Sequence, residues 1–176
     1  MADIELDNTF DQSDLNTVRR LKDRASYDKR QIADIFKQAK ICHVAFLYDG
    51  LPQCIPMIAA LEETPEGDLF VYFHGKHSIA LYPFPPTLSL MSCQKGYSKA
   101  RFMEALMEKG TPMTATATIF DGYVLALSVF NHSMNYRSAV LHGVSLPFDG
   151  DDDNGKMRVL KLVVDSTTPG RWENSR

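Results

Sequence analysis

Short apolar segments separated by turn signals most constrain how this chain can fold. Six such segments lie at residues 41–48, 53–61, 69–73, 113–120, 123–130 and 138–146. The dipeptides Asp49-Gly50 and Asp121-Gly122 each stand between two of them, and Asp-Gly favours tight hairpin turns. The pattern predicts a meander of about six antiparallel strands. Because closure removes exposed strand edges, a closed or half-closed barrel is favoured.

Helices are expected beside the strands, so the predicted fold class is mainly β with flanking helices. Asp28 is a plausible N-cap for residues 29–39, whose apolar side chains Ile32, Ile35, Phe36 and Ala39 fall on one helical face. Residues 156–164 carry apolar side chains at helical spacing. This C-terminal helix is expected to pack across one end of the barrel.

Size and charge narrow the class of protein. With 176 residues and 44% hydrophobic content, the chain predicts one domain at 17–176 after a flexible acidic arm at 1–16. A net charge of −3 gives no broad basic field and argues against a nucleic-acid partner. No apolar run approaches the roughly 20 residues that span a bilayer. Three cysteines without a CxxC pair and no signal-type N-terminus favour a soluble, cytoplasmic protein.

The candidate binding chemistry begins at residues 131–143, where polar groups precede an apolar strand. Arg137 offers a fork of donors, Ser138 a hydroxyl and Asn135 an amide, which together suit a flat, anionic ligand. Asn135-Tyr136-Arg137-Ser138, the strand 54–59 with Pro56, and His74-Gly75 carry a resemblance to a known family. The chain resembles the flavin-nucleotide-binding proteins related to pyridoxamine 5′-phosphate oxidase, in the branch of the nitroimidazole-resistance reductases.

The resemblance implies an FMN-binding split β-barrel of about six antiparallel strands and a homodimer with the flavin between subunits. It implies cofactor-binding residues in three groups. These are Pro56, Met57 and Ile58 beside the flavin ring; His74, Gly75, Ser98, Lys99 and Arg101 at the phosphate; and Asn135, Tyr136, Arg137 and Ser138 in the most specific motif.

The residues alone leave alternatives open at two of these groups. Lys99 and Arg101 precede a helix expected at 102–109, where backbone N–H groups and the helix dipole suit an anion. Basic residues at a helix start are also common as solvated side chains. Pro56 marks an edge or a bulge, where backbone can face a cofactor, but a simple edge strand accounts for it equally well.

The chain departs from the family pattern at two places. Residues 76–96 are a predicted insertion between His74-Gly75 and Tyr97–Arg101, interpreted either as a translated intron or as a genuine loop with its own phosphate contacts. The proline-broken segment 82–91 within it fits neither strand nor helix. The family normally continues past residues 170–172, so a truncated C-terminus is also expected.

These observations lead to a flavin-dependent oxidoreductase of unknown substrate as the first hypothesis, with the reaction carried by the cofactor. The alternatives are a flavin or haem carrier without turnover, and an apo form disabled by the insertion and truncation. No general acid or base is assigned. His74 and His132 are candidates to contact substrate or flavin, and a hydrogen-bonded structural role is the alternative for both, favoured for His132. No metal site is expected: the acidic loop 149–155 lacks the glutamate of a calcium loop, and His74, His77 and Cys93 lack zinc-site spacing.

Overall fold

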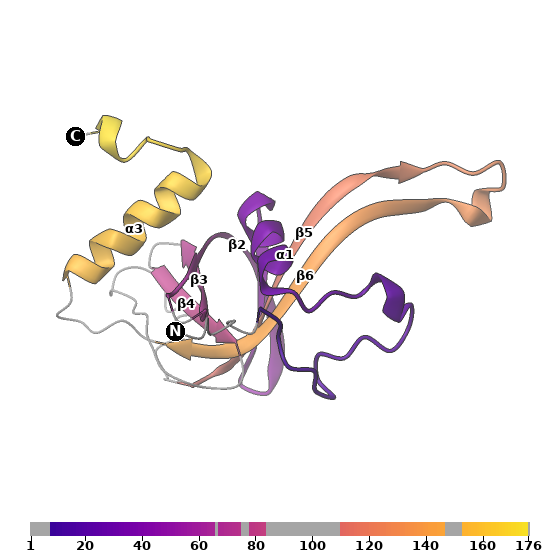
Figure 1. Cartoon of the computed structure of the whole chain (residues 1–176), viewed down its shortest axis with the longest axis horizontal. Coiled ribbons are helices and arrows are strands. Elements are labelled where there is room, and N and C mark those ends of the chain that lie inside the picture. Colours follow the sequence, from indigo (N-terminus) through magenta and orange to yellow (C-terminus); the bar gives the residue numbers. More distant parts are fainter. Residues whose placement is uncertain (1–7, 66, 75–77, 84–109, 147–152, 176) are drawn as a thin grey trace, which may run out of the picture.

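A computed structural model of the chain describes residues 8–65, 67–74, 78–83, 110–146 and 153–175. Its centre is a barrel of six antiparallel strands in the order β1-β2-β3-β4-β6-β5, with β5 pairing back to β1 (Figure 1). The strands are β1 Cys42–Tyr48, β2 Leu51–Glu63, β3 Leu69–His74, β4 Ser78–Pro83, β5 Pro112–Val124 and β6 Ser133–Leu146. The helices are α1 Lys29–Gln38 and α3 Asp153–Thr167, with short 3-10 turns at Lys22–Arg24, Val129–Asn131 and Glu173–Ser175. The predicted fold class is confirmed.

Local signals account for the first half of the fold. The Asp28 carboxylate accepts a hydrogen bond from the Gln31 backbone N–H at 2.9 Å, so it caps α1 as predicted. The β1–β2 hairpin turns at Asp49-Gly50, where both residues have positive φ angles of 50° and 71°. Such angles define the two-residue turn that Asp-Gly favours.

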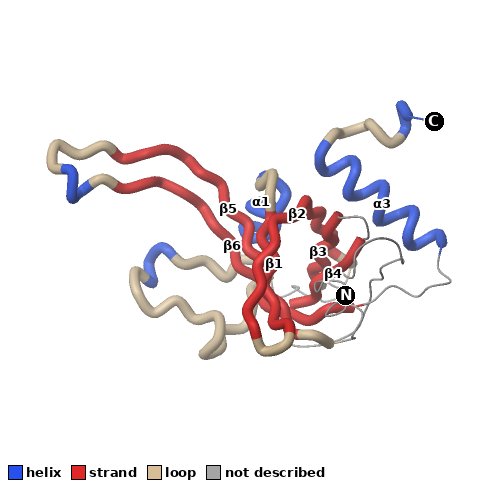
Figure 2. Tube along the Cα trace, turned by 180° about the vertical axis from the view of Figure 1, so that it is seen from behind, coloured by secondary structure: helices blue, strands red, loops and turns tan. Residues whose placement is uncertain are grey.

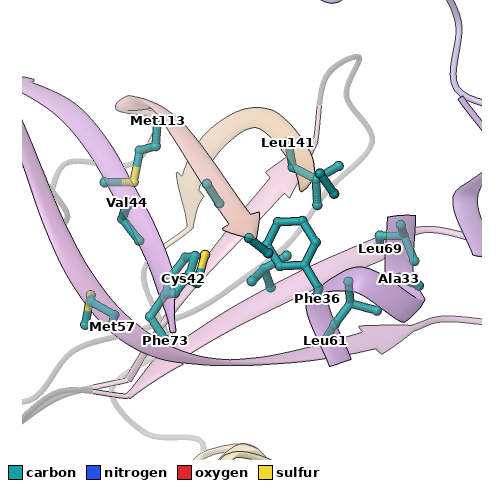
Figure 3. Close-up of a cluster of buried hydrophobic side chains, with 14 of the residues drawn as sticks. Ala33, Phe36, Cys42, Val44, Met57, Leu61, Leu69, Phe73, Met113 and Leu141 are labelled. Carbon is teal, nitrogen blue, oxygen red and sulfur yellow. The ribbon is translucent and has the colours of Figure 1, made fainter. Parts of the chain in front are cut away.

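The barrel interior is filled by apolar side chains that alternate along the strands. Val44, Val71, Phe73 and Ala115 are fully buried there, and Phe36 of α1 joins the same cluster (Figure 3). The residues at the opposite parity of the same strands face outward from the barrel. The interior is therefore a packed core, and any ligand site has to lie outside it.

Strand β4 falls inside the segment predicted as an insertion. Ser78–Pro83 pairs with β3 on one side and β6 on the other, and so closes the ring between them. The expectation that 82–91 contains no strand was wrong for Tyr82 and Pro83, because a proline at the end of a strand costs little pairing. Residues 84–96 lie outside the described part of the chain, and the intron hypothesis stays a prediction.

Helix α3 packs against the outside of strands β2 and β3 and not across an end of the barrel. Val159 and Val163 are buried against Ala60 and Phe70, which face outward from β2 and β3. An ionic group also joins the two layers at this face. Arg158 donates hydrogen bonds to the Glu62 carboxylate and the Tyr72 hydroxyl, and Tyr72 donates to Glu62 at 2.6 Å.

This ionic group anchors α3. Burial raises the pKa of Tyr72, and its hydrogen bond to Glu62 adds to the effect. Burial alone would raise the pKa of Glu62, but the hydrogen bonds from Arg158 and Tyr72 outweigh it and lower that pKa. The three side chains satisfy one another, so they are interpreted as structural.

The outer halves of β5 and β6 leave the barrel as a long two-stranded arm (Figures 1 and 2). Asp121-Gly122, expected as the turn, lies in mid-strand at a β-bulge, where Phe120 pairs with Tyr136 and Gly122 with Asn135. The turn prediction was wrong because a bulge also uses a glycine at positive φ, here 134°. The chain reverses at the tip, residues 125–132, where the Ala126 N–H donates to His132 Nδ1 at 3.1 Å. This hydrogen bond agrees with a structural role for His132.

The described part of the predicted N-terminal arm, residues 8–16, lies against the segment that precedes α1. Thr9 forms a β-bridge with Asp28, and the Phe10 N–H donates to the Tyr27 carbonyl at 2.9 Å. The Phe10 side chain packs against the main core cluster. These residues are therefore held beside the base of the β5–β6 arm, as both views show (Figures 1 and 2).

Candidate functional site

The outer face of four neighbouring strands, β2, β1, β5 and β6, is the candidate site. The strand registers place Pro56 opposite His43, His43 opposite Thr116, and Thr116 opposite Val140. This row of four crosses the whole face, and at the usual strand spacing it extends for roughly 14 Å. Pro56, His43 and Val140 are exposed and Thr116 is partly exposed. We call this surface the outer face.

A second row runs parallel to the first one. Cys54 lies opposite Ala45, Ala45 opposite Thr114, and Thr114 opposite His142. The Thr114 hydroxyl and His142 Nδ1 are 3.0 Å apart and share a hydrogen bond. The side chains of these two rows are small, β-branched or hydrogen-bonding, so a planar ring system can lie flat on the rows without displacing a bulky group.

The outer face continues along the arm as an aromatic strip. Phe120 pairs with Tyr136, and the bulge brings Tyr123 opposite Met134 on the same side. The Phe120 and Tyr123 rings meet edge to face, with centroids 4.7 Å apart. Apolar and hydroxyl-bearing side chains therefore follow one another without a break from the barrel to the arm.

The predicted site residues divide between this face and other places. Pro56, Ile58, Tyr136 and Ser138 share its parity and are exposed, with Ser138 opposite Thr118. Met57 has the opposite parity and is buried in the barrel interior, only 9% exposed. A buried side chain cannot touch a ligand on the outer face, although its backbone can. The role predicted for each of these residues stays a prediction.

Arg137 and Asn135 belong to the other side of the arm. The Arg137 guanidinium donates two hydrogen bonds to the Asp121 carboxylate, at 3.0 and 2.9 Å. The hydrogen bond from Arg137 lowers the pKa of Asp121. Both side chains are solvent-exposed, so an incoming anion would have to compete with Asp121 for the guanidinium.

Most of the residues predicted to bind the phosphate have no described position relative to the outer face. Gly75, Ser98, Lys99, Arg101 and the helix expected at 102–109 lie outside the described residues. His74 is described as the last residue of β3, where its backbone pairs with Ile58 of the outer-face strand β2. The end of β3 is therefore next to the predicted ring-side segment.

Sequence reasoning missed His43, Thr114, Thr116 and His142 as members of one surface. Each is a polar residue at an outward position of a strand, but alternation in one strand does not reveal what stands opposite it. Only the register brings them into rows. Within the described ranges, no three His, Cys, Asp or Glu side chains are placed to hold a metal ion, and no helix is long and apolar enough to cross a membrane.

The closed ring of six antiparallel strands, with α1 packed on its interior cluster, is a split β-barrel. Residues 94–176 match the sequence family described as pyridoxamine 5′-phosphate oxidase. Together with the similar structures below, this match confirms the resemblance of the chain to the pyridoxamine 5′-phosphate oxidase-like flavin-binding group. Among curated proteins, none matches the sequence.

Three solved structures are similar to this chain. The flavocytochrome Anf3 from Azotobacter vinelandii has 28% identity and a TM-score of 0.66, over 93% of this chain and 63% of its own. The FAD and heme binding protein from Mycobacterium smegmatis has 25% identity and a TM-score of 0.57, over 86% of this chain and 59% of its own. A putative 5-nitroimidazole antibiotic resistance protein from Bacteroides thetaiotaomicron has 19% identity and a TM-score of 0.51, over 81% of this chain and 68% of its own. The chain thus spans about 60% of the first two relatives.

Proposed function

We propose that the chain binds a flavin nucleotide, FMN, with its ring on the outer face. The observation that carries the proposal is the row formed by Pro56, His43, Thr116 and Val140, a broad exposed surface without bulky side chains. Two of the similar structures are named for a flavin or a flavocytochrome, which supports the same ligand class. One of them binds FAD, so FMN and FAD are compared in the test.

Each part of the outer face has a defined task in this proposal. Pro56 and Val140 supply apolar contact at the two sides of the row, while Thr116 and His43 supply hydrogen bonds to polar edges of the ring. The predicted group at residues 74–75 and 98–101 would hold the phosphate. When bound, the flavin supplies hydride or electron transfer, and the protein orients the ring and excludes water from one side of it. On this basis we propose an oxidoreductase.

The test is titration of the purified chain with FMN and, separately, with FAD, followed by quenching of flavin fluorescence. Thr116→Trp places a large ring in the middle of the row and is expected to weaken binding at least tenfold. Thr167→Trp is the matched control, because Thr167 is exposed at the end of α3, far from the row in sequence and on a different layer. Equal affinities for both variants, or no binding of either flavin, would refute the proposal.

We also propose that the protein forms a homodimer through the arm. Eight large side chains on the arm are at least half exposed: Phe120, Tyr123, Leu125, Leu127, Val129, Phe130, Met134 and Tyr136. With roughly 150–250 Å² for a large aromatic side chain, they present on the order of 1,000 Å², similar to the about 800 Å² per partner of a stable interface. A second copy of the chain presents the same apolar side chains on its arm, so the two arms can bury these side chains against each other.

The dimer is tested by light scattering during size-exclusion chromatography. Leu127→Glu at the tip is expected to give the monomer mass, because a charge would have to be buried in the interface. Leu51→Glu, an exposed position in the β1–β2 hairpin, is the control and should leave the mass unchanged. A wild-type monomer at micromolar concentration would contradict the proposal.

Haem is the second candidate, because two similar structures are named for haem or a cytochrome. His43 is exposed within the first row, and in this proposal its imidazole would serve as an axial ligand on the outer face. A Soret band that is lost in His43→Ala would establish haem. A purified protein that shows only flavin absorbance after haem addition would exclude it.

A further inference from the structure

A cavity of about 330 Å³ lies between the N-terminal segment and the base of strand β6. Its size is at the lower end of the range for small-molecule sites, roughly 300–1,000 Å³. Phe10 and Tyr27 contribute aromatic walls, and Val18, Ile32 and Val140 contribute aliphatic ones. Binding of an apolar molecule to a concave apolar surface of this kind is favourable, because it removes apolar surface from water.

The wall on the N-terminal side is held in place by hydrogen bonds of its own. The Val18 N–H donates to the Tyr27 hydroxyl at 2.8 Å, and that hydroxyl donates to the Asn16 carbonyl. The Asn16 side chain in turn accepts from the Ser13 N–H at 2.7 Å. These polar groups hydrogen-bond to one another within the N-terminal segment. Their main effect is therefore to fix the shape of the cavity wall and not to bind a ligand.

Unlike these groups, the His142 side chain keeps one ring nitrogen without a hydrogen bond among the described residues. Its Nδ1 shares the hydrogen bond with Thr114, and Nε2 makes none within the described residues. Burial lowers the pKa of His142, which keeps the imidazole neutral at pH 7. His142 therefore offers an uncharged hydrogen-bonding atom to a cavity whose wall is largely apolar.

Charge excludes one class of ligand. Asp11 lines the cavity, and among the described residues no lysine or arginine does. A phosphate or carboxylate would lose hydration here without gaining a cation, so the flavin phosphate has to bind elsewhere.

We propose that this cavity binds a neutral aromatic molecule of one or two rings that carries one hydrogen-bonding oxygen, directed at Nε2 of His142. Val140 belongs both to the cavity wall and to the first row of the outer face. A molecule in the cavity would thus lie beside a ring seated on that face, in the position of a substrate. This last step, unlike the binding itself, rests on the proposed flavin function.

The test uses 2-naphthol, whose fluorescence anisotropy reports binding to the flavin-free full chain. Saturable binding is expected, and 2-naphthoate should bind at least tenfold more weakly because of its charge. His142→Phe keeps the ring but removes the hydrogen bond, and should weaken 2-naphthol binding roughly five- to tenfold. Val18→Trp places a large ring on the cavity wall and should abolish binding.

Val124→Trp is the matched control, since Val124 on the arm is 39% exposed and Val18 is 43% exposed. It should bind 2-naphthol like the wild type. Equal binding by both tryptophan variants, unchanged binding by His142→Phe, or no saturable binding would each overturn the inference. FMN titration of the same samples separates the two proposals. Binding of FMN without 2-naphthol removes the cavity proposal alone, and binding of 2-naphthol without FMN supports the cavity while removing the flavin function.

Discussion

Phe73→Ala should destabilise the barrel more than any change on its surface. The Phe73 side chain is 0% exposed in the interior cluster. The substitution removes roughly 100 Å² of buried apolar area, which at about 25 cal/mol/Å² corresponds to about 2.5 kcal/mol. The cavity left behind adds to this, and measured Phe→Ala changes in cores cost about 3–5 kcal/mol. That is a large fraction of the typical 5–15 kcal/mol stability of a domain.

The measurement is urea unfolding followed by circular dichroism, with the free energy taken from the midpoint and the slope. Phe130→Ala is the matched control, because Phe130 at the arm tip is 94% exposed. In the monomer it should change the free energy of unfolding by no more than about 0.5 kcal/mol. Two protein concentrations separate any dimer contribution. A cost below about 1 kcal/mol for Phe73→Ala would refute the described core.

Three further predictions concern other parts of the molecule. Because burial lowers the pKa of His142 below its unfolded value of about 6.5, the unfolded state takes up this proton first as pH falls. Stability should therefore be complete above pH 6.5 and decline below it, and urea unfolding of His142→Phe should show a weaker decline. Val163→Asp places a charge in the buried contact between α3 and the barrel, and should make that helix sensitive to limited proteolysis. Met157→Asp should not, because Met157 is 46% exposed on the same helix. Deleting residues 76–96 removes β4 and should lower the urea midpoint, since β3 and β6 lose their partner; an unchanged midpoint would instead support the insertion hypothesis.

The sequence predicted those elements whose signals are local. Asp28 before an amphipathic run specified α1, and Asp49-Gly50 specified the first hairpin. Asp121-Gly122 was misassigned because the same dipeptide serves a turn and a bulge, and the apolar residues beyond it continue the strand pattern in either case. Strand β4 was missed because prolines interrupt its surroundings, while its partners β3 and β6 are distant in sequence.

The site could be predicted only in part for a related reason. Pro56 and Ser138 were predicted through the resemblance, and both lie on the outer face, while their role stays a prediction. His43 and Thr116 lie more than seventy residues apart in sequence and become neighbours only through the pairing of β1 with β5. Register depends on the closed barrel as a whole, so no single segment encodes it.

The bulge at Asp121 has a consequence for how the arm can vary among relatives. One additional residue there shifts the alternation of β5, so that Phe120 and Tyr123, three positions apart, point to the same side. Without that residue, every later side chain of β5 would point to the opposite side of the arm. Tyr123 would then lie on the side of Arg137, and the aromatic strip would be interrupted. We therefore expect natural arms of this type to lengthen or shorten by two residues at a time, and single-residue changes to occur only in the reversing loop.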